Sequence, residues 1–180
     1  MMTVKEETPR LTPRQREGRA INAVAELLRR TLSVPNIYLE PPASLISADV
    51  LAVDRGGAGD LHAVEIKFFE KKSILGPRTR LLEIIRRVYH QLMYMPAHFR
   101  YLAVPTSYLD ILHGDLSRLG LYAQDGIGRL GIITITEKGA DSPVAEIALA
   151  PERFRVDPAK LKAIETKLLA KSRPDIEVRI

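Results

Sequence analysis

The sequence predicts an α/β domain with a central mixed β-sheet flanked by helices. Short apolar runs rich in β-branched residues occur between segments whose apolar residues recur at helical spacing. The chain has 180 residues, which is enough for one compact domain but short for two. Its composition, 46% hydrophobic and 27% charged, is that of an ordinary globular protein.

An amphipathic helix is predicted from residue 13 to about residue 31. Thr12 and Gln15 match a capping box, with Pro13 at the first helical position. The apolar face consists of Ile21, Val24, Ala25, Leu28 and Leu32, and the polar face carries Arg19, Asn22, Glu26 and Arg30.

Three extended segments are predicted next, at residues 36–40, 48–54 and 61–69. The last two are apolar and β-branched, and the glycine-rich residues 56–59 separate them. This arrangement is typical of two strands that pair around a glycine turn.

A second amphipathic helix is predicted at residues 79–95. Its apolar residues recur at alternating steps of four and three, and the pattern ends at Pro96. The stripe consists of Leu81, Ile85, Val88, Leu92 and Met95. A strand at 99–104, a helix at 107–119 and a further strand then suggest a crossover connection packed on the sheet.

The remaining predicted elements close the domain. Residues 121–124 and 130–136 flank a hairpin signature, and residues 144–150 form one more strand candidate. Asp157 and Pro158 then begin a last helix, in which Leu161, Ile164 and Leu168 face inward.

Composition limits the classes of function. There is no cysteine, which excludes disulfides, thiolate zinc sites and a cysteine nucleophile. No apolar run approaches the roughly 20 residues of a membrane span, and the polar start lacks a secretion signal, so we expect a soluble, cytoplasmic protein without a membrane partner. The net charge of +5 favours a polyanionic partner.

Three charged residues stand within the predicted strand pair. Asp49 lies on one strand, and Glu65 and Lys67 lie on the other, among residues suited to burial. If the turn centres on Gly57, Asp49 lies opposite Glu65, and like charges so placed are destabilising without a cation. Hard divalent ions prefer oxygen ligands and keep waters, so the pair predicts an Mg²⁺ site with the Lys67 amine on the same side.

This interpretation depends on the register. A slip of one residue would send Asp49 to the other face of the sheet, whereas a slip of two would keep it. The alternative is that Asp49 ends a strand against water, and that Glu65 and Lys67 belong to a solvated face. The four histidines show no paired metal-ligand spacing, and structural or surface roles are the better interpretation for each.

The order helix, strand, strand with Asp49, strand with Glu65-Ile66-Lys67, helix, strand resembles the PD-(D/E)XK nuclease superfamily, which has the restriction-endonuclease-like αβββαβ core. The resemblance covers residues 13–136. It implies a flexible N-terminus at residues 1–12 and a C-terminal extension of a strand and a helix at residues 137–180.

The resemblance also implies roles for individual residues. Asp49 and Glu65 would bind Mg²⁺ or Mn²⁺ with the backbone carbonyl of Ile66, and Lys67 would be the catalytic lysine. Many members add a glutamate of the first helix, here Glu26, and a glutamine of the later helix, here Gln91. Two departures are that Ala48 replaces the motif proline and that Tyr94 follows Gln91 by three residues, where RecB-like nucleases have four. Glu26 could equally be an ordinary solvated residue.

Basic residues concentrate after the acidic pair and favour binding to phosphates. The candidate nucleic-acid-binding residues are Lys71, Lys72, Arg80, Arg86, Arg87 and Tyr94. Tyr94 could stack on a base, although a tyrosine at a helix edge is more often packed against its own protein, and a basic run is often only solvated.

The function expected from the sequence and the resemblance is Mg²⁺-dependent hydrolysis of phosphodiester bonds, in DNA more than in RNA. The alternative is a nucleic-acid-binding module on the same fold with weak or no catalysis. A third class is a structural protein whose basicity is incidental. The sequence leaves homodimerisation open.

Overall fold

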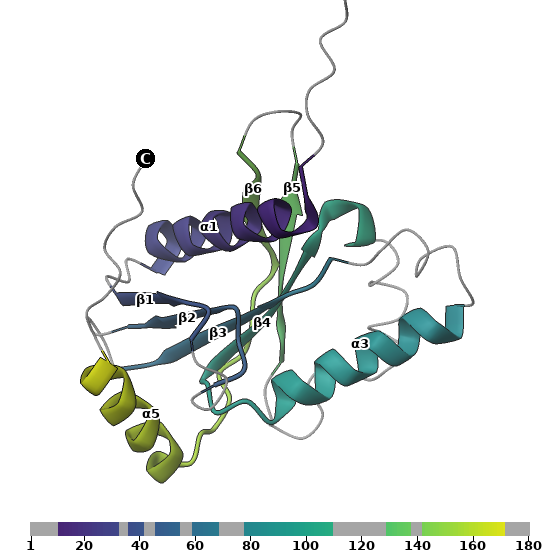
Figure 1. The fold of residues 1–180 in the computed structure, drawn as a ribbon. Helices are drawn as coiled ribbons and strands as arrows, with labels where there is room; N and C mark the ends of the chain where they lie inside the picture. The colour runs from purple at the N-terminus through teal and green to yellow at the C-terminus, as the bar shows by residue number, and fades with distance from the viewer. Residues whose placement is uncertain are drawn as a thin grey trace, which may run out of the picture.

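The structure, a computed structural model, describes residues 11–32, 36–41, 46–54, 59–68, 78–109, 129–137 and 142–171 (Figure 1). The elements are α1 (Pro13–Leu32), β1 (Asn36–Leu39), β2 (Val50–Val53), β3 (Leu61–Ile66), α3 (Arg78–Met93), β4 (Phe99–Pro105), the short 3₁₀ helix η1 (Thr106–Tyr108), β5 (Gly131–Thr136), β6 (Val144–Leu149) and α5 (Pro158–Lys171).

The strands form one six-stranded mixed sheet in the order β1-β2-β3-β4-β5-β6. The strands β1, β2 and β3 pair antiparallel, β3, β4 and β5 pair parallel, and β6 pairs antiparallel with β5. The predicted α/β class with a mixed central sheet is therefore confirmed. Parallel neighbours such as β4 and β5 require a crossover connection, and most of the helix predicted for it lies outside the described residues.

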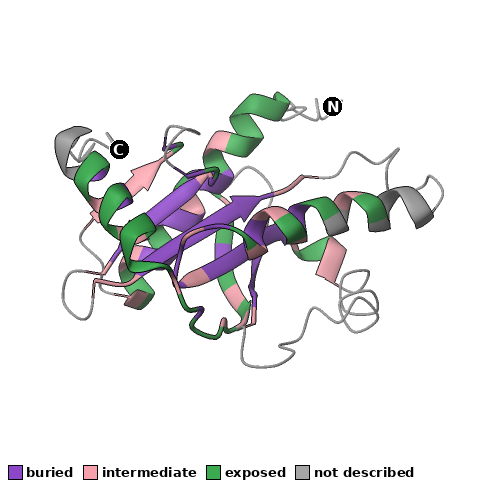
Figure 2. Cartoon of the chain, turned by 90° about the horizontal axis from the view of Figure 1, so that it is seen from below, coloured by how far each residue is buried: buried purple, intermediate pink, exposed green. Residues whose placement is uncertain are grey.

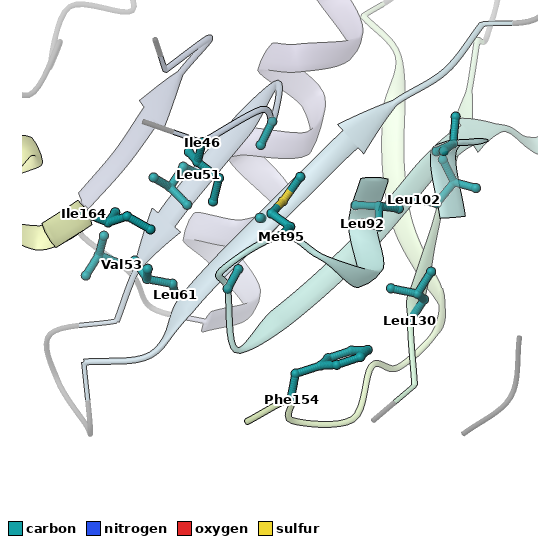
Figure 3. Close-up of a cluster of buried hydrophobic side chains, with 14 of the residues drawn as sticks. Ile46, Leu51, Val53, Leu61, Leu92, Met95, Leu102, Leu130, Phe154 and Ile164 are labelled. Carbon is teal, nitrogen blue, oxygen red and sulfur yellow. The ribbon is translucent and has the colours of Figure 1, made fainter. Parts of the chain in front are cut away.

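Helices cover both faces of this sheet. Helix α1 lies on one face, and α3 and α5 lie on the other (Figure 1). Alternation along each strand supplies a core on each side, because successive side chains point to opposite faces. Val50, Val64 and Tyr101 pack under α1, whereas Leu51, Leu61 and Leu102 pack under α3 and α5 (Figure 3).

The inner strands β2 to β5 are largely buried, the edge strands β1 and β6 are partly exposed, and the helices expose their outer surfaces (Figure 2). All the residues of β2 and β3 are buried, which agrees with a sheet covered on both faces. Both strands are shorter than predicted. Asp49 lies in a bend just before β2, and Lys67 lies just after β3, so the charged residues stand at the strand ends where solvent is accessible.

The predicted helix starts are present. In α1, the backbone N–H of Thr12 donates to the side chain of Gln15 at 2.9 Å, and the N–H of Gln15 donates to Thr12 Oγ1 at 3.3 Å, which is a capping box. At α5, the N–H of Ala159 donates to Asp157 Oδ1 at 2.9 Å.

Residues 142–171 share the sheet and the core of the preceding residues. Strand β6 pairs with β5 along its length, with one irregularity near Ile132. Phe154, Ile164 and Leu168 are buried in the core under α3 and α5 (Figure 3). The C-terminal segment that the resemblance set apart is thus packed as part of the same body.

Two histidines at the start of β3 and β4 are buried with polar partners. His62 is 5% exposed, stacks on Phe99 with ring centroids 4.6 Å apart, and lies 3.3 Å from the Tyr101 hydroxyl. His98 Nδ1 accepts the N–H of Leu61 at 3.0 Å, which makes this histidine neutral although Asp60 is close. Both are structural, as the sequence analysis favoured.

Several predictions concern residues outside the described ranges. These are the N-terminal residues 1–10, most of the predicted helix at 107–119, the strand candidate at 121–124, and the turn of its hairpin. No described helix is long and apolar enough to cross a membrane.

Candidate active site

Strands β2 and β3 pair in the register that a turn centred on Gly57 predicts. Val50 faces Val64, and Val53 faces Leu61. The ladder ends one residue before Asp49 and Glu65. The two acids are nevertheless neighbours, because Asp49 Oδ2 accepts the N–H of Ile66 and both acids line one hollow. The predicted register is confirmed for residues 50–53 and 61–64.

The position of Asp49 is fixed by three hydrogen bonds. Its N–H donates to the Val64 carbonyl at 2.9 Å, and its own carbonyl accepts the N–H of Glu40 at 2.8 Å. Its carboxylate oxygen Oδ2 accepts the N–H of Ile66 at 2.6 Å. The side chain is thus held across the end of β3, beside Glu65. The resemblance assigned a role to the carbonyl of Ile66, whereas the contact seen here is made by its N–H.

Glu65 is a buried acid with a lysine partner. It is 5% exposed, and its Oε1 lies 2.5 Å from the Lys67 amine. Burial raises the pKa of Glu65, the charge of Asp49 raises it further, and hydrogen bonds from Lys67 and Gln91 act in the opposite direction. The two acids therefore repel each other across a short gap, and Lys67 supplies part of the compensating charge.

Gln91 connects helix α3 to this site. Its amide nitrogen donates to the hydroxyl of Ser47 at 3.0 Å and approaches the Ser47 carbonyl at 3.3 Å. The same amide hydrogen-bonds Glu65. Gln91 therefore bridges the segment before Asp49 and the acid on β3; a glutamine of this helix is what the resemblance implied for the site.

A shallow hollow of about 220 Å³ opens over the acids. Its lining is Glu40, Pro41, Ser47, Ala48, Asp49 and Glu65. Glu40 and Ser47 were not predicted from the sequence. Glu40 could have been found only from the register of β1 on β2, in which Leu39 faces Val50 and Glu40 therefore comes beside Asp49. Ser47 gives no signal in the sequence, because its role depends on where α3 packs.

Glu26 does not join these groups. It lies on α1, which covers the other face of the sheet, and it pairs with Arg29 at 3.8 Å. It lines a separate groove between α1 and the start of β6, where Val144 is also found. The solvated alternative fits Glu26 better than a ligand role.

The candidate nucleic-acid-binding residues divide into two groups. Arg87 and Tyr94 are exposed on α3 and just after it, and Tyr94 is 83% exposed. The side chains of Arg80 and Arg86 on α3, and the whole of Lys71 and Lys72, lie outside what the structure describes. The exposure of Tyr94 contradicts the interpretation that this ring is packed.

Comparison with known proteins shows a similarity of fold, without a family or a function. No protein-family model matches the chain, and no curated protein matches it. Among solved structures, the chain is similar to the SPO1766 protein of unknown function from Silicibacter pomeroyi, with 19% sequence identity and a TM-score of 0.50. The match covers 90% of this chain and 87% of that one.

The donor set suits a hard divalent ion better than a soft one. Within the described ranges, no three His, Cys, Asp or Glu side chains converge as a metal-binding group. Mg²⁺ commonly takes one or two carboxylates and keeps several waters, so Asp49 and Glu65 beside an open hollow fit that ion. Zinc sites are usually built with His or Cys ligands, and neither lines the hollow.

Proposed function

We propose that this protein is a metal-dependent nuclease of the PD-(D/E)XK type that hydrolyses phosphodiester bonds, in DNA more than in RNA. The observation that carries the proposal is the convergence of Asp49 and Glu65 at the ends of β2 and β3, with the Lys67 amine 2.5 Å from Glu65. The basic charge of the chain and the exposed Arg87 also support a polyanionic substrate.

Asp49 and Glu65 would hold Mg²⁺ or Mn²⁺. When bound, the ion would polarise the phosphate and lower the pKa of a bound water. The protein contributes two negative charges that cannot move apart, because Ile66 fixes Asp49 and the strand fixes Glu65. A rigid acidic pair is pre-organised for a cation, so little conformational entropy is lost on binding.

Lys67 and Gln91 have separate roles. In the described structure the Lys67 amine compensates the charge of Glu65. With a divalent cation held by Asp49 and Glu65, the Lys67 amine would be free to orient a water molecule and to stabilise charge on the phosphate. Gln91 holds Glu65 and Ser47 in place, and we assign it a positioning role.

Cleavage assays with matched variants test this proposal. Purified protein is incubated with plasmid, linear and branched DNA and with RNA, with Mg²⁺ or with EDTA. We expect cutting that requires the metal and that falls at least a hundredfold in Asp49→Asn, Glu65→Gln and Lys67→Met, since metal and electrostatic contributions are of this order. The exposed residues Glu83 and Lys160 provide controls, because Glu83→Gln and Lys160→Met change the same charges elsewhere.

The second candidate is a nucleic-acid-binding module that does not cut. The observation that favours it is the lack of a third converging acid within the described part of the chain. This candidate predicts salt-sensitive binding by the intact protein without cleavage of any substrate. Cutting that survives in Lys67→Met and Glu65→Gln would contradict both candidates for this site.

A further inference from the structure

Two side chains of α3 and one just after it form a stripe that includes Gln91 of the candidate site. Arg87, Gln91 and Tyr94 occur at intervals of four and three residues, which places them along one face of a helix. Tyr94 keeps helical geometry, because its N–H donates to the His90 carbonyl at 3.2 Å. Gln91 reaches Ser47 and Glu65, so Tyr94 stands one helical turn from the site.

The ring of Tyr94 is available for a ligand. Tyr94 is 83% exposed, whereas Tyr101 is 2% exposed in the core. Among the described residues, Tyr94 and Val144 are the large hydrophobic side chains that remain exposed, and Val144 lies on the far edge strand. A flat amphipathic ring with no packing role, beside a proposed phosphate site, suits stacking against a base.

The rim of the hollow just after β1 is negatively charged. Glu40 is exposed there and lines the hollow with Asp49. A phosphate backbone that ran past this rim would be repelled, whereas one that ran along α3 would meet Arg87 and the Tyr94 ring. This unequal distribution of charge favours a single nucleic-acid strand that runs along α3 over a duplex whose two strands lie on either side of the hollow.

We propose that the substrate presents unpaired nucleotides next to the cleaved phosphate, as in a single strand, a flap or a gap, and that one of these bases stacks on Tyr94. The inference rests on the proposed nuclease function. Bases in an intact duplex cover each other's faces, so only an unpaired base offers the flat surface that the ring requires.

Binding and cutting are measured separately to test this. Fluorescence anisotropy in EDTA follows labelled single-stranded, gapped and blunt duplex DNA, and parallel reactions in Mg²⁺ follow cleavage. We expect Tyr94→Ala to weaken binding of single-stranded and gapped DNA by about tenfold and to leave duplex binding unchanged, because stacking contributes about that factor per base. Tyr94→Phe should retain binding, and Arg87→Gln should weaken binding of all three substrates.

A change in the DNA gives a matched test. A series of single-stranded DNAs is prepared, each with one base removed at a different position. At one of these positions, the loss of the base should weaken binding to the wild-type protein by the same factor as Tyr94→Ala weakens binding to the intact strand. Removal of that base should have no further effect in the variant. Equal losses for duplex and unpaired substrates, or independent effects of the two changes, would overturn the inference and leave the nuclease proposal standing. Failure of the wild type to bind or cut any nucleic acid would overturn both.

Discussion

The carboxylate oxygen Oδ2 of Asp49 accepts a hydrogen bond of 2.6 Å from the backbone N–H of Ile66. This bond joins the start of β2 to the last residue of β3, one residue after Glu65. Among the described residues, the hydrogen bond to this carboxylate uses Oδ2, and Oδ1 is the oxygen with which it would meet a cation. Asp49 therefore has a structural role and a proposed binding role, and suitable substitutions separate them.

Removal of the Asp49 carboxylate should destabilise the fold. Ile66 is 3% exposed, so its N–H would lose its partner in Asp49→Ala. We expect the free energy of unfolding to fall by about 1–2 kcal/mol, the cost of a buried unsatisfied donor. Asp49→Asn retains an acceptor oxygen and should lose less than half as much. Urea unfolding at pH 7 measures both variants, and equal stability of Asp49→Ala and wild type would contradict this assignment.

Divalent ions should stabilise the folded protein through the acidic pair. Burial and the charge of Asp49 raise the pKa of Glu65, so its ionised form is unfavourable without a cation. Mg²⁺ at several times its Kd should add about 1 kcal/mol and raise the Tm by about 2–4 °C. Glu65→Gln and Asp49→Asn should lose this rise, whereas Glu83→Gln should keep it. A rise of the same size in all four proteins would point to a site elsewhere.

His62 should make the fold sensitive to acid. Burial lowers the pKa of His62 from 6.5 to about 4, with Asp60 and Asp54 acting weakly in the opposite direction. The neutral form is the one that fits the fold, so its stabilising effect is complete above pH 6.5 and is lost as the pH falls toward 4. The loss is on the order of 3 kcal/mol for a shift of this size.

A pair of histidine variants checks the pH dependence. His62→Gln should flatten the decrease in unfolding free energy between pH 6.5 and pH 4. His90→Gln, at an exposed position of α3, should follow the wild-type curve. Parallel curves for His62→Gln and wild type would show that other groups cause the acid sensitivity.

Two glycines should respond oppositely to alanine. A Cβ atom on Gly131 would lie 2.6 Å from the ring of Tyr101 and 3.0 Å from Pro151, in the buried strand β5. Gly131→Ala should therefore cost about 1–3 kcal/mol through overpacking. Gly18 lies within α1 with nothing within 4 Å of such an atom, and Gly18→Ala should stabilise by about 0.5–1 kcal/mol. Thermal unfolding measures both variants, and the Tm should fall in Gly131→Ala and rise in Gly18→Ala.

Local signals in the sequence were sufficient for the fold and for the acidic pair. The glycine-rich residues 56–59 predicted a turn between two strands, and the register expected from that turn is the one in which β2 and β3 pair, with Asp49 and Glu65 just beyond the last pair. The helix caps at Thr12 and Asp157 could also be predicted from the sequence, because their hydrogen-bond partners are only two or three residues away.

The rest of the site depends on contacts that are distant in the sequence. Ser47 meets Gln91 across 44 residues, and Glu40 reaches the hollow only because β1 pairs with β2. Glu26 was placed by family resemblance, and helical periodicity alone does not determine which face of the sheet α1 covers. Tyr94 had two interpretations, stacking on a base or packing, and the choice depended on its exposure: it lies in the turn after α3 and is 83% exposed, whereas Leu92 and Met95 are buried.

The most direct test of the central claim is a crystal structure of the protein grown with Mn²⁺, with anomalous diffraction recorded near the manganese edge. We predict one strong peak at about 2.0–2.3 Å from a carboxylate oxygen of Asp49 and from one of Glu65, the distance range of a hard divalent ion. We also predict that the Lys67 amine no longer contacts Glu65 Oε1. Crystals in which Asp49 and Glu65 bind no ion at saturating Mn²⁺, or in which the ion binds elsewhere, would contradict the account.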